Sequence, residues 1–142
     1  MRNAQEVAMY VIDKCYNEKC AISNLQLQKI LYCLQVAFLK KYDTFCFEDD
    51  MIAEKIGAVV KIVYNKYCGY GSLKICENYD IDYLFNSEEK VVVDDIVETK
   101  RNMKIWDLIK ETNAQDKAWD IIYNNGLGSK TIIPKTLMKK NG

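Results

Sequence analysis

The chain has 142 residues, of which 49% are apolar and 28% are charged. This length and composition suit one domain with a buried core and exclude a disordered or fibrous chain. The 20 basic residues balance the 20 acidic ones, so the chain lacks the basic excess typical of domains built mainly to bind nucleic acid. No apolar run reaches the roughly 18 residues of a membrane span, and the first residues lack the pattern of a signal peptide, so we expect a cytoplasmic protein without membrane contact.

Histidine is absent and six cysteines are present, and both facts limit the expected chemistry. Without histidine, the commonest general base at neutral pH and the usual serine and cysteine triads are missing. No two cysteines have the CxxC spacing that lets two thiolates hold one zinc ion, so we expect reduced, buried thiols. We therefore predict no enzymatic activity, no metal and no cofactor. The cysteines are Cys15, Cys20, Cys33, Cys46, Cys68 and Cys76.

Short acidic runs are the remaining candidates for acid–base catalysis or for binding a hard cation. They are Glu48-Asp49-Asp50, Glu88-Glu89 and Asp94-Asp95. Neighbours in sequence rarely converge on one point, and none of the runs has the spacing of a calcium loop. A solvated surface is the favoured interpretation.

Two helices are predicted in the first third of the chain. Apolar residues recur at spacings of three and four over residues 3–16, which predicts the first helix. Ser23 and Gln26 have the spacing of a capping box, so a second helix should begin there and end near residue 41. Its long apolar stripe makes it the expected central helix.

The middle of the chain predicts a little β structure and a third helix. Phe45-Cys46-Phe47 and Met51-Ile52-Ala53 are short apolar runs separated by acidic residues, which favours a small hairpin or two extended pieces. After Gly57, apolar residues from Val59 to Tyr67 have helical spacing, and the glycines that follow would close this helix.

Two more helices are predicted after an irregular stretch. Asn86 and Glu89 have the spacing of an N-cap, and the valine-rich stripe that follows predicts a helix to about residue 101. A shorter helix is expected from residue 102, with Trp106 on its apolar face.

Asn113 is predicted to cap the next helix, which Asn125-Gly126 would terminate, and Pro134 suits the first turn of a last short helix. The sum is a mainly α fold with a little β structure (α+β). We expect one domain over residues 1–142, a helical bundle of about six helices with a small β-hairpin.

Three blocks of the sequence resemble the Panacea domain family. Residues 22–32, ISNLQLQKILY, are similar to the run SNLKLQKLLYF that is typical of the family. Residues 51–64, MIAEKIGAVVKIVY, resemble its second block, and residues 104–122, KIWDLIKETNAQDKAWDII, are similar to its C-terminal region. The residues that agree in the later blocks are Gly57, Val59, Val60, Tyr64 and Trp119.

The chain also departs from the family pattern. Ala58 stands where proline is usual, and Glu54 or Lys55 where tryptophan is common. Asn113 stands where a histidine is frequent, so any role of that histidine does not carry over.

The resemblance implies an antitoxin. Members of the family are encoded beside diverse toxins and neutralise them by binding, and the SocA-like branch works as an adaptor that delivers its toxin to a protease. The expected partner is therefore a protein, a toxin or a host defence protein.

Candidate contact residues come from the first block, the acidic run and the tyrosines. Gln28 and Lys29 lie off the strict apolar stripe, and tyrosine carries a polar tip that often anchors protein interfaces. The acidic run could face a basic surface on a toxin. Core packing and ordinary solvation are the competing interpretations. The candidates are Gln28, Lys29, Tyr32, Glu48, Asp49, Asp50, Tyr64, Tyr67, Tyr70, Tyr79 and Tyr83.

Two other functions stay open at the level of sequence. A phage-encoded inhibitor of a host defence nuclease would use the same binding logic on another target. A DNA-binding regulator would need a basic recognition face, which the neutral charge does not obviously supply, although the lysines near the end of the sequence leave room for a weak nucleic-acid contact.

Overall fold

The computed structural model describes all 142 residues and contains seven α-helices, two short 3-10 helices and one two-stranded sheet. The predicted fold class, mainly α with a small hairpin, is confirmed, with one helix more than the six or so expected. The elements in chain order are α1 Ala4–Asn17, α2 Asn24–Tyr42, β1 Ile52–Glu54, β2 Gly57–Val59, α3 Lys61–Tyr67, η1 Cys68–Tyr70, α4 Ser87–Arg101, α5 Ile105–Thr112, α6 Ala118–Tyr123, η2 Asn124–Gly126 and α7 Lys135–Asn141.

Three helices begin at complete capping boxes, whose N-cap residues are Asn3 for α1, Ser23 for α2 and Asn86 for α4. In each box the N-cap side chain accepts a hydrogen bond from the backbone amide three residues on, and the side chain there accepts from the N-cap amide. These reciprocal bonds satisfy amides that a helix leaves free at its start. The predicted starts of these three helices are correct; that of α1 was predicted from its apolar periodicity, and those of α2 and α4 from the spacing of their capping residues.

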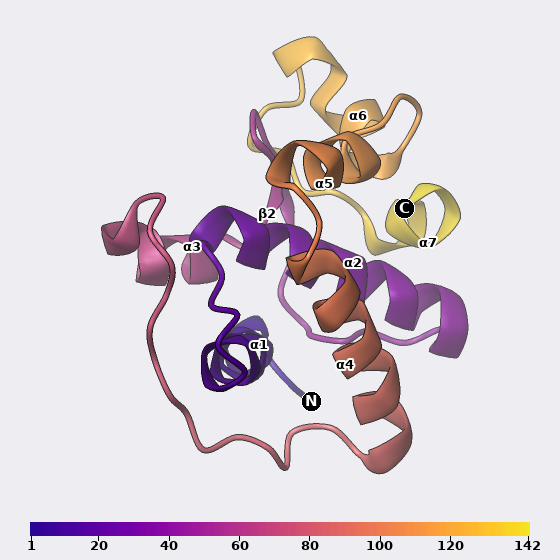
Figure 1. The fold of residues 1–142 in the computed structure, drawn as a ribbon. Helices are drawn as coiled ribbons and strands as arrows, with labels where there is room; N and C mark the ends of the chain where they lie inside the picture. Colours follow the sequence, from indigo (N-terminus) through magenta and orange to yellow (C-terminus); the bar gives the residue numbers. More distant parts are fainter.

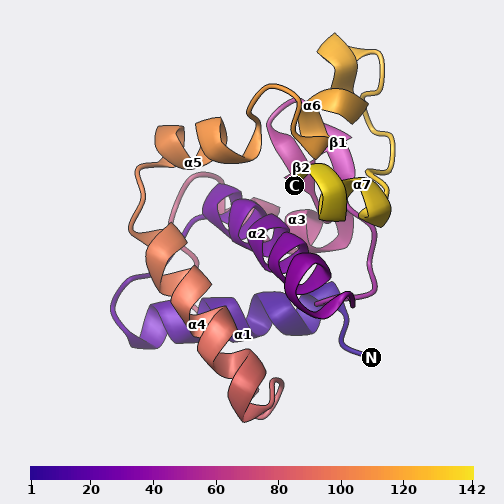
Figure 2. The same ribbon diagram turned by 90° about the vertical axis from the view of Figure 1, so that its right-hand side faces the viewer.

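Helix α2 is the central element of the fold. Figures 1 and 2 show it crossing the middle of the molecule, with α1, α4, α5, α7 and the hairpin arranged around it. Twelve of its 19 residues are buried, including several polar ones. It therefore carries much of a core of 31 residues to which most other elements contribute.

The hairpin lies later in the chain than predicted. Strands β1 and β2 pair antiparallel, with Ala53 opposite Ala58, whereas residues 45–47 belong to no strand. The buried side chain of Gln35 on α2 holds residues 45–47 instead, because its Oε1 accepts from the Cys46 amide at 2.7 Å and its Nε2 donates to the Phe47 carbonyl at 2.8 Å. Of the two arrangements expected here, the hairpin between residues 45–47 and 51–53 is wrong.

A late segment of the chain covers the free edge of β1. The Lys130 amide donates to the Ala53 carbonyl at 2.7 Å, and the Ile133 amide donates to the Met51 carbonyl at 2.9 Å. These bonds satisfy edge groups that an isolated hairpin would leave open. They also bring the approach to α7 against the hairpin.

Helix α3 begins two residues later than the pattern suggested. Val59 lies in β2, and the Val60 amide donates to Gln28 Oε1 on α2 at 3.0 Å. Both residues have an extended backbone conformation, so the first helical residue is Lys61.

The predictions for α5 and α6 need two corrections. Trp106 is 73% exposed, because the face of α5 that packs inward carries Leu108 and Thr112. Asn113 ends α5 as its C-cap and does not cap α6, which begins at Ala118 without a side-chain cap. Pro134 directly precedes α7, close to its predicted place.

No helix is both long enough and apolar enough to cross a membrane.

Candidate functional site

A buried lysine joins the three sequence blocks that resemble the family. The Lys29 side chain is 1% exposed, and its Nζ donates to the Ile56 carbonyl at 2.6 Å and to Asn113 Oδ1 at 3.2 Å. No carboxylate pairs with it, and burial lowers the pKa of Lys29 to about 8. A single ammonium on α2 thus holds the turn of the hairpin and the C-terminal end of α5 together.

Gly57 is required by the same arrangement. Its φ of +128° is a conformation that residues with a side chain rarely adopt, and a Cβ there would lie 1.9 Å from Lys29 Nζ. The glycine that agrees with the second block is therefore the residue that lets the lysine reach the turn.

Gln28 supports the neighbouring backbone. It is fully buried, and its Nε2 donates to Asn24 Oδ1 at 3.0 Å while its Oε1 accepts from the Val60 amide. Gln28 and Lys29 lie off the apolar stripe as expected, but α2 is surrounded on nearly every side, so both face the interior. In this conformation neither side chain is accessible to a partner.

A tryptophan of the third block fixes the hairpin from the other side. Trp119 Nε1 donates to the Glu54 carbonyl at 2.8 Å, and its ring stacks on Tyr123 with centroids 4.8 Å apart. Glu54 or its neighbour Lys55 stands where tryptophan is common in the family that the sequence resembles. The link between the second and third blocks is made here from α6.

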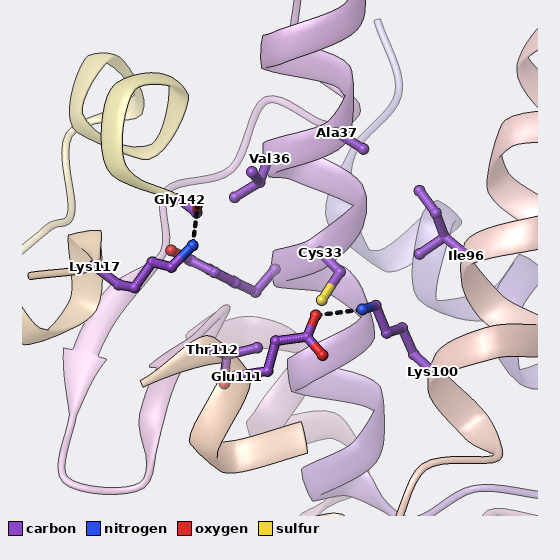
Figure 3. Close-up of a pocket in the computed structure, with 10 residues that line it drawn as sticks. Cys33, Val36, Ala37, Ile96, Lys100, Glu111, Thr112, Lys117 and Gly142 are labelled. Atoms are coloured by element: carbon purple, nitrogen blue, oxygen red, sulfur yellow. Dashed lines mark hydrogen bonds and ion pairs between the residues drawn. The ribbon is translucent and has the colours of Figure 1, made fainter. Parts of the chain in front are cut away.

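A cavity of about 270 Å³ lies beside this buried centre, where α2 meets α4, the end of α5 and the residues around Lys117 and Gly142 (Figure 3). Tyr32 lines it and is 3% exposed, and its hydroxyl has no hydrogen-bond partner. Burial raises the pKa of Tyr32 to about 12 and that of the Cys33 thiol to about 11, so both groups stay protonated at neutral pH.

Three of the predicted tyrosines gather around a carboxylate that sequence reasoning missed. Tyr70 and Tyr79 both donate to Glu77, the former at 2.8 Å, and the Tyr67 hydroxyl lies 2.9 Å from that of Tyr79. These hydrogen bonds lower the pKa of Glu77. Lys66 Nζ lies 5.6 Å from the Tyr67 ring centroid, so an opposite charge lies nearby.

The hydrogen bonds of the tyrosine cluster are all made within this chain. Tyr67 is 2% exposed, and the three hydroxyls are already used, so the cluster fastens the long segment after η1 to α3. The aromatic run was visible in the sequence, but its convergence on Glu77 depends on how that irregular segment turns.

The other two tyrosines have open surface. Tyr83 is 77% exposed. Tyr64 is half-buried and lines a cavity of about 210 Å³ with Glu54 and Lys61, whose charged groups are 3.7 Å apart.

The three residues of the acidic run differ in whether their carboxylates contact other groups of the protein. Asp49 Oδ1 accepts from the Ala4 amide at 2.7 Å and so helps to hold the start of α1. Asp50 pairs with Lys135 at 3.0 Å, and Glu48 is exposed. Glu48 leaves an unpaired negative charge on the surface, whereas Asp50 forms an ion pair and Asp49 is hydrogen-bonded to the backbone.

The cysteines do not form a site. All six are free; Cys15 and Cys46 are buried as expected, whereas Cys68 and Cys76 are exposed. No group of three or more potential metal ligands is present.

Comparison with known proteins gives one finding. No curated protein and no solved structure matches the chain significantly. The family model described as "Antitoxin SocA-like, Panacea domain" matches residues 27–120, which include Lys29, Gly57, Asn113 and Trp119. This match covers well over half of the chain, and the protein therefore belongs to the SocA-like antitoxin Panacea domain family.

Proposed function

We propose that this protein is an antitoxin that neutralises a cognate toxin by direct binding and performs no chemistry of its own. The observation that carries the proposal is the family match over residues 27–120, which spans the buried contacts joining α2, the hairpin, α5 and α6. Those contacts build a rigid centre, and a rigid scaffold lowers the entropy lost when a surface is ordered on binding.

The residues offered to the toxin are those that keep accessible surface. Among the predicted contact residues these are Glu48, Asp50, Tyr64, Tyr70 and Tyr83. Gln28, Lys29, Tyr32 and Tyr67 act in the proposal as supports beneath that surface. Asp49 accepts from the Ala4 amide, and the backbone amide of Tyr79 donates to Asp13. The unpaired negative charge of Glu48 would speed association with a basic toxin surface more than it would tighten the complex.

Delivery of the bound toxin to a protease is the finer form of the proposal, by likeness to the SocA branch. An adaptor needs two separate surfaces, one for the toxin and one for the protease. Exposed apolar side chains are spread over several elements, with Leu73 and Leu127 at 71% and 87% exposure, which leaves room for two contact areas.

The test is coexpression with the product of the neighbouring gene. That product alone should arrest growth, and coexpression with this protein should restore it. Tagged antitoxin should retain the toxin in a stoichiometric complex at moderate salt. Toxin levels should rise on deletion of a cytosolic protease only if the protein also acts as an adaptor.

Three outcomes would contradict the proposal. Growth arrest that persists despite a well-expressed, folded antitoxin would remove neutralisation. Recovery of a host nuclease in place of a neighbouring toxin would indicate a defence inhibitor. Salt-sensitive recovery of DNA without a protein partner would indicate a regulator.

A further inference from the structure

The cavity between α2 and α4 contains a polar group whose hydrogen bonding the protein does not complete. The Tyr32 hydroxyl is buried and has no partner, although a buried hydroxyl without a hydrogen bond costs folding stability. Thr112, another polar residue of the lining, already has a hydrogen-bond partner, because its Oγ1 donates to the Leu108 carbonyl at 3.1 Å. The tyrosine hydroxyl is thus available to an atom that enters the cavity.

The same cavity is lined by a lysine that has no carboxylate side chain as its counter-ion. Lys117 Nζ, which lines it, and Lys40 Nζ, which does not, both donate to the Gly142 oxygen at 3.1 Å. Neither lysine forms an ion pair with a carboxylate side chain. The backbone oxygen of Gly142 is the one acceptor that Lys117 contacts, so its ammonium has no side-chain counter-ion in the cavity.

The remaining charges of the lining cancel. Lys100 pairs with Glu111 across the cavity from Lys117 (Figure 3). The Cys33 thiol lies close to this pair and is neutral, because burial raises its pKa to about 11. The electrostatic preference of the cavity therefore comes from Lys117 and favours an anion.

Apolar side chains line another part of the cavity. Val36 and Ala37 on α2 face it, together with Ile96 on α4 (Figure 3). The volume of about 270 Å³ is slightly below the range of ordinary ligand pockets, which admits a small molecule and excludes a nucleotide.

We propose that this cavity binds a small monocarboxylate with an apolar body. The carboxylate accepts hydrogen bonds from the Tyr32 hydroxyl and the Lys117 ammonium, and the body packs against Val36, Ala37 and Ile96. A carboxylate has two acceptor oxygens and so serves both donors at once. The donors suit it because the tyrosine stays protonated at neutral pH.

The test uses benzoate and hexanoate as probes on the full chain labelled with ¹⁵N. Titration should shift the amide signals of Val36, Ala37, Ile96 and Thr112, with a dissociation constant on the order of 1 mM or tighter. Benzyl alcohol has the apolar body without the charge, and acetate has the charge without the body. Both should bind at least about fivefold more weakly than benzoate, because benzyl alcohol lacks the carboxylate and acetate lacks the apolar body.

Two pairs of variants locate the site. Tyr32→Phe removes only the hydroxyl and should weaken benzoate binding about tenfold. Tyr42→Phe is its matched control, because the Tyr42 hydroxyl is also buried without a partner but does not line the cavity. Lys117→Met should weaken binding similarly, and Lys110→Met should not, because Lys110 is exposed on α5 and does not line the cavity.

The outcomes are decisive because Tyr32→Phe is nearly isosteric and should fold. Thermal unfolding of each variant within a few degrees of the wild type establishes that it does. The proposal is overturned if no cavity amide shifts with either carboxylate. It is also overturned if the cavity variants and their controls bind benzoate equally well, or if benzyl alcohol binds as tightly as benzoate.

Discussion

At the scale of single residues, Lys29 is a charged side chain that the fold buries. It is almost fully buried, no carboxylate pairs with it, and its two acceptors are neutral oxygens. Burial disfavours its charged form, which lowers the pKa of Lys29 from 10.5 to about 8. The unfolded chain therefore binds this proton more tightly than the folded protein does.

This pKa difference predicts a pH-dependent stability. The cost of burying the charge is fully present below pH 8 and disappears as the pH rises to about 10.5, so the folded state gains stability over that window. The gain is roughly 3 kcal/mol at most. Urea unfolding of the wild type and of Lys29→Met at several pH values should show a difference that grows in favour of the wild type from pH 8 to 10.5.

Lys110→Met is the matched control for losing a lysine, since Lys110 is exposed on α5. If the stability difference from the wild type changes with pH in the same way for both variants, that change results from the loss of any lysine charge. If the difference between wild type and Lys29→Met is flat across the window, the ammonium is not desolvated as the structure indicates.

At the scale of elements, the helix starts depend on whether a side chain closes them. The starts of α1, α2 and α4 could be predicted, because each has a capping box that is legible as two residues at fixed spacing. Helices α3, α5 and α6 begin after Val60, Lys104 and Lys117, none of which makes a capping hydrogen bond. Their starts are set by tertiary contacts, so the local sequence misplaced all three; α5 was expected from residue 102 and begins at Ile105.

The capping box of α2 gives a direct prediction. Ser23→Ala removes the acceptor for the Gln26 amide, which lies 3.3 Å from Ser23 Oγ, and should lower the free energy of unfolding by about 1 kcal/mol. Ser87→Ala is the control, because Ser87 is exposed one residue after the cap of α4 and should change stability by less than about 0.5 kcal/mol. Equal effects in urea titrations would mean that the box does not stabilise α2.

At the scale of the whole molecule, the fold class and most of the core were predictable, but the meeting of the three blocks was not. Lys29 and Asn113 are 84 residues apart in sequence, and only the packing of α5 against α2, with its C-terminal end at the hairpin turn, brings them together. The same packing decides which polar residues of α2 are buried. A local pattern gives one apolar stripe for a helix, whereas α2 is covered on several sides by different elements.

The exposure of the aromatic residues could not be predicted from local pattern for the same reason. Periodicity placed Trp106 on the inner face of its helix, yet α5 rests on Leu108 and Thr112 and turns Trp106 to solvent. Tyr83 is exposed as well, in the long segment between η1 and α4. Figure 1 shows this segment passing along the lower side of the molecule, whereas α5 lies near the top, so the two aromatics belong to separate regions of the surface.

Trp106 is the stronger candidate for a central toxin contact. Tryptophan is enriched among residues that dominate binding energy, and Ile105 and Ile109 extend the apolar surface of α5 around it. Trp106→Ala should weaken toxin binding by at least about tenfold and leave the thermal midpoint unchanged, because the side chain is 73% exposed. Tyr83→Ala removes an equally exposed aromatic from the other region and serves as the comparison. If calorimetry shows that only Tyr83→Ala weakens binding, the toxin docks on the segment between η1 and α4, and the surface of α5 remains free for a second partner.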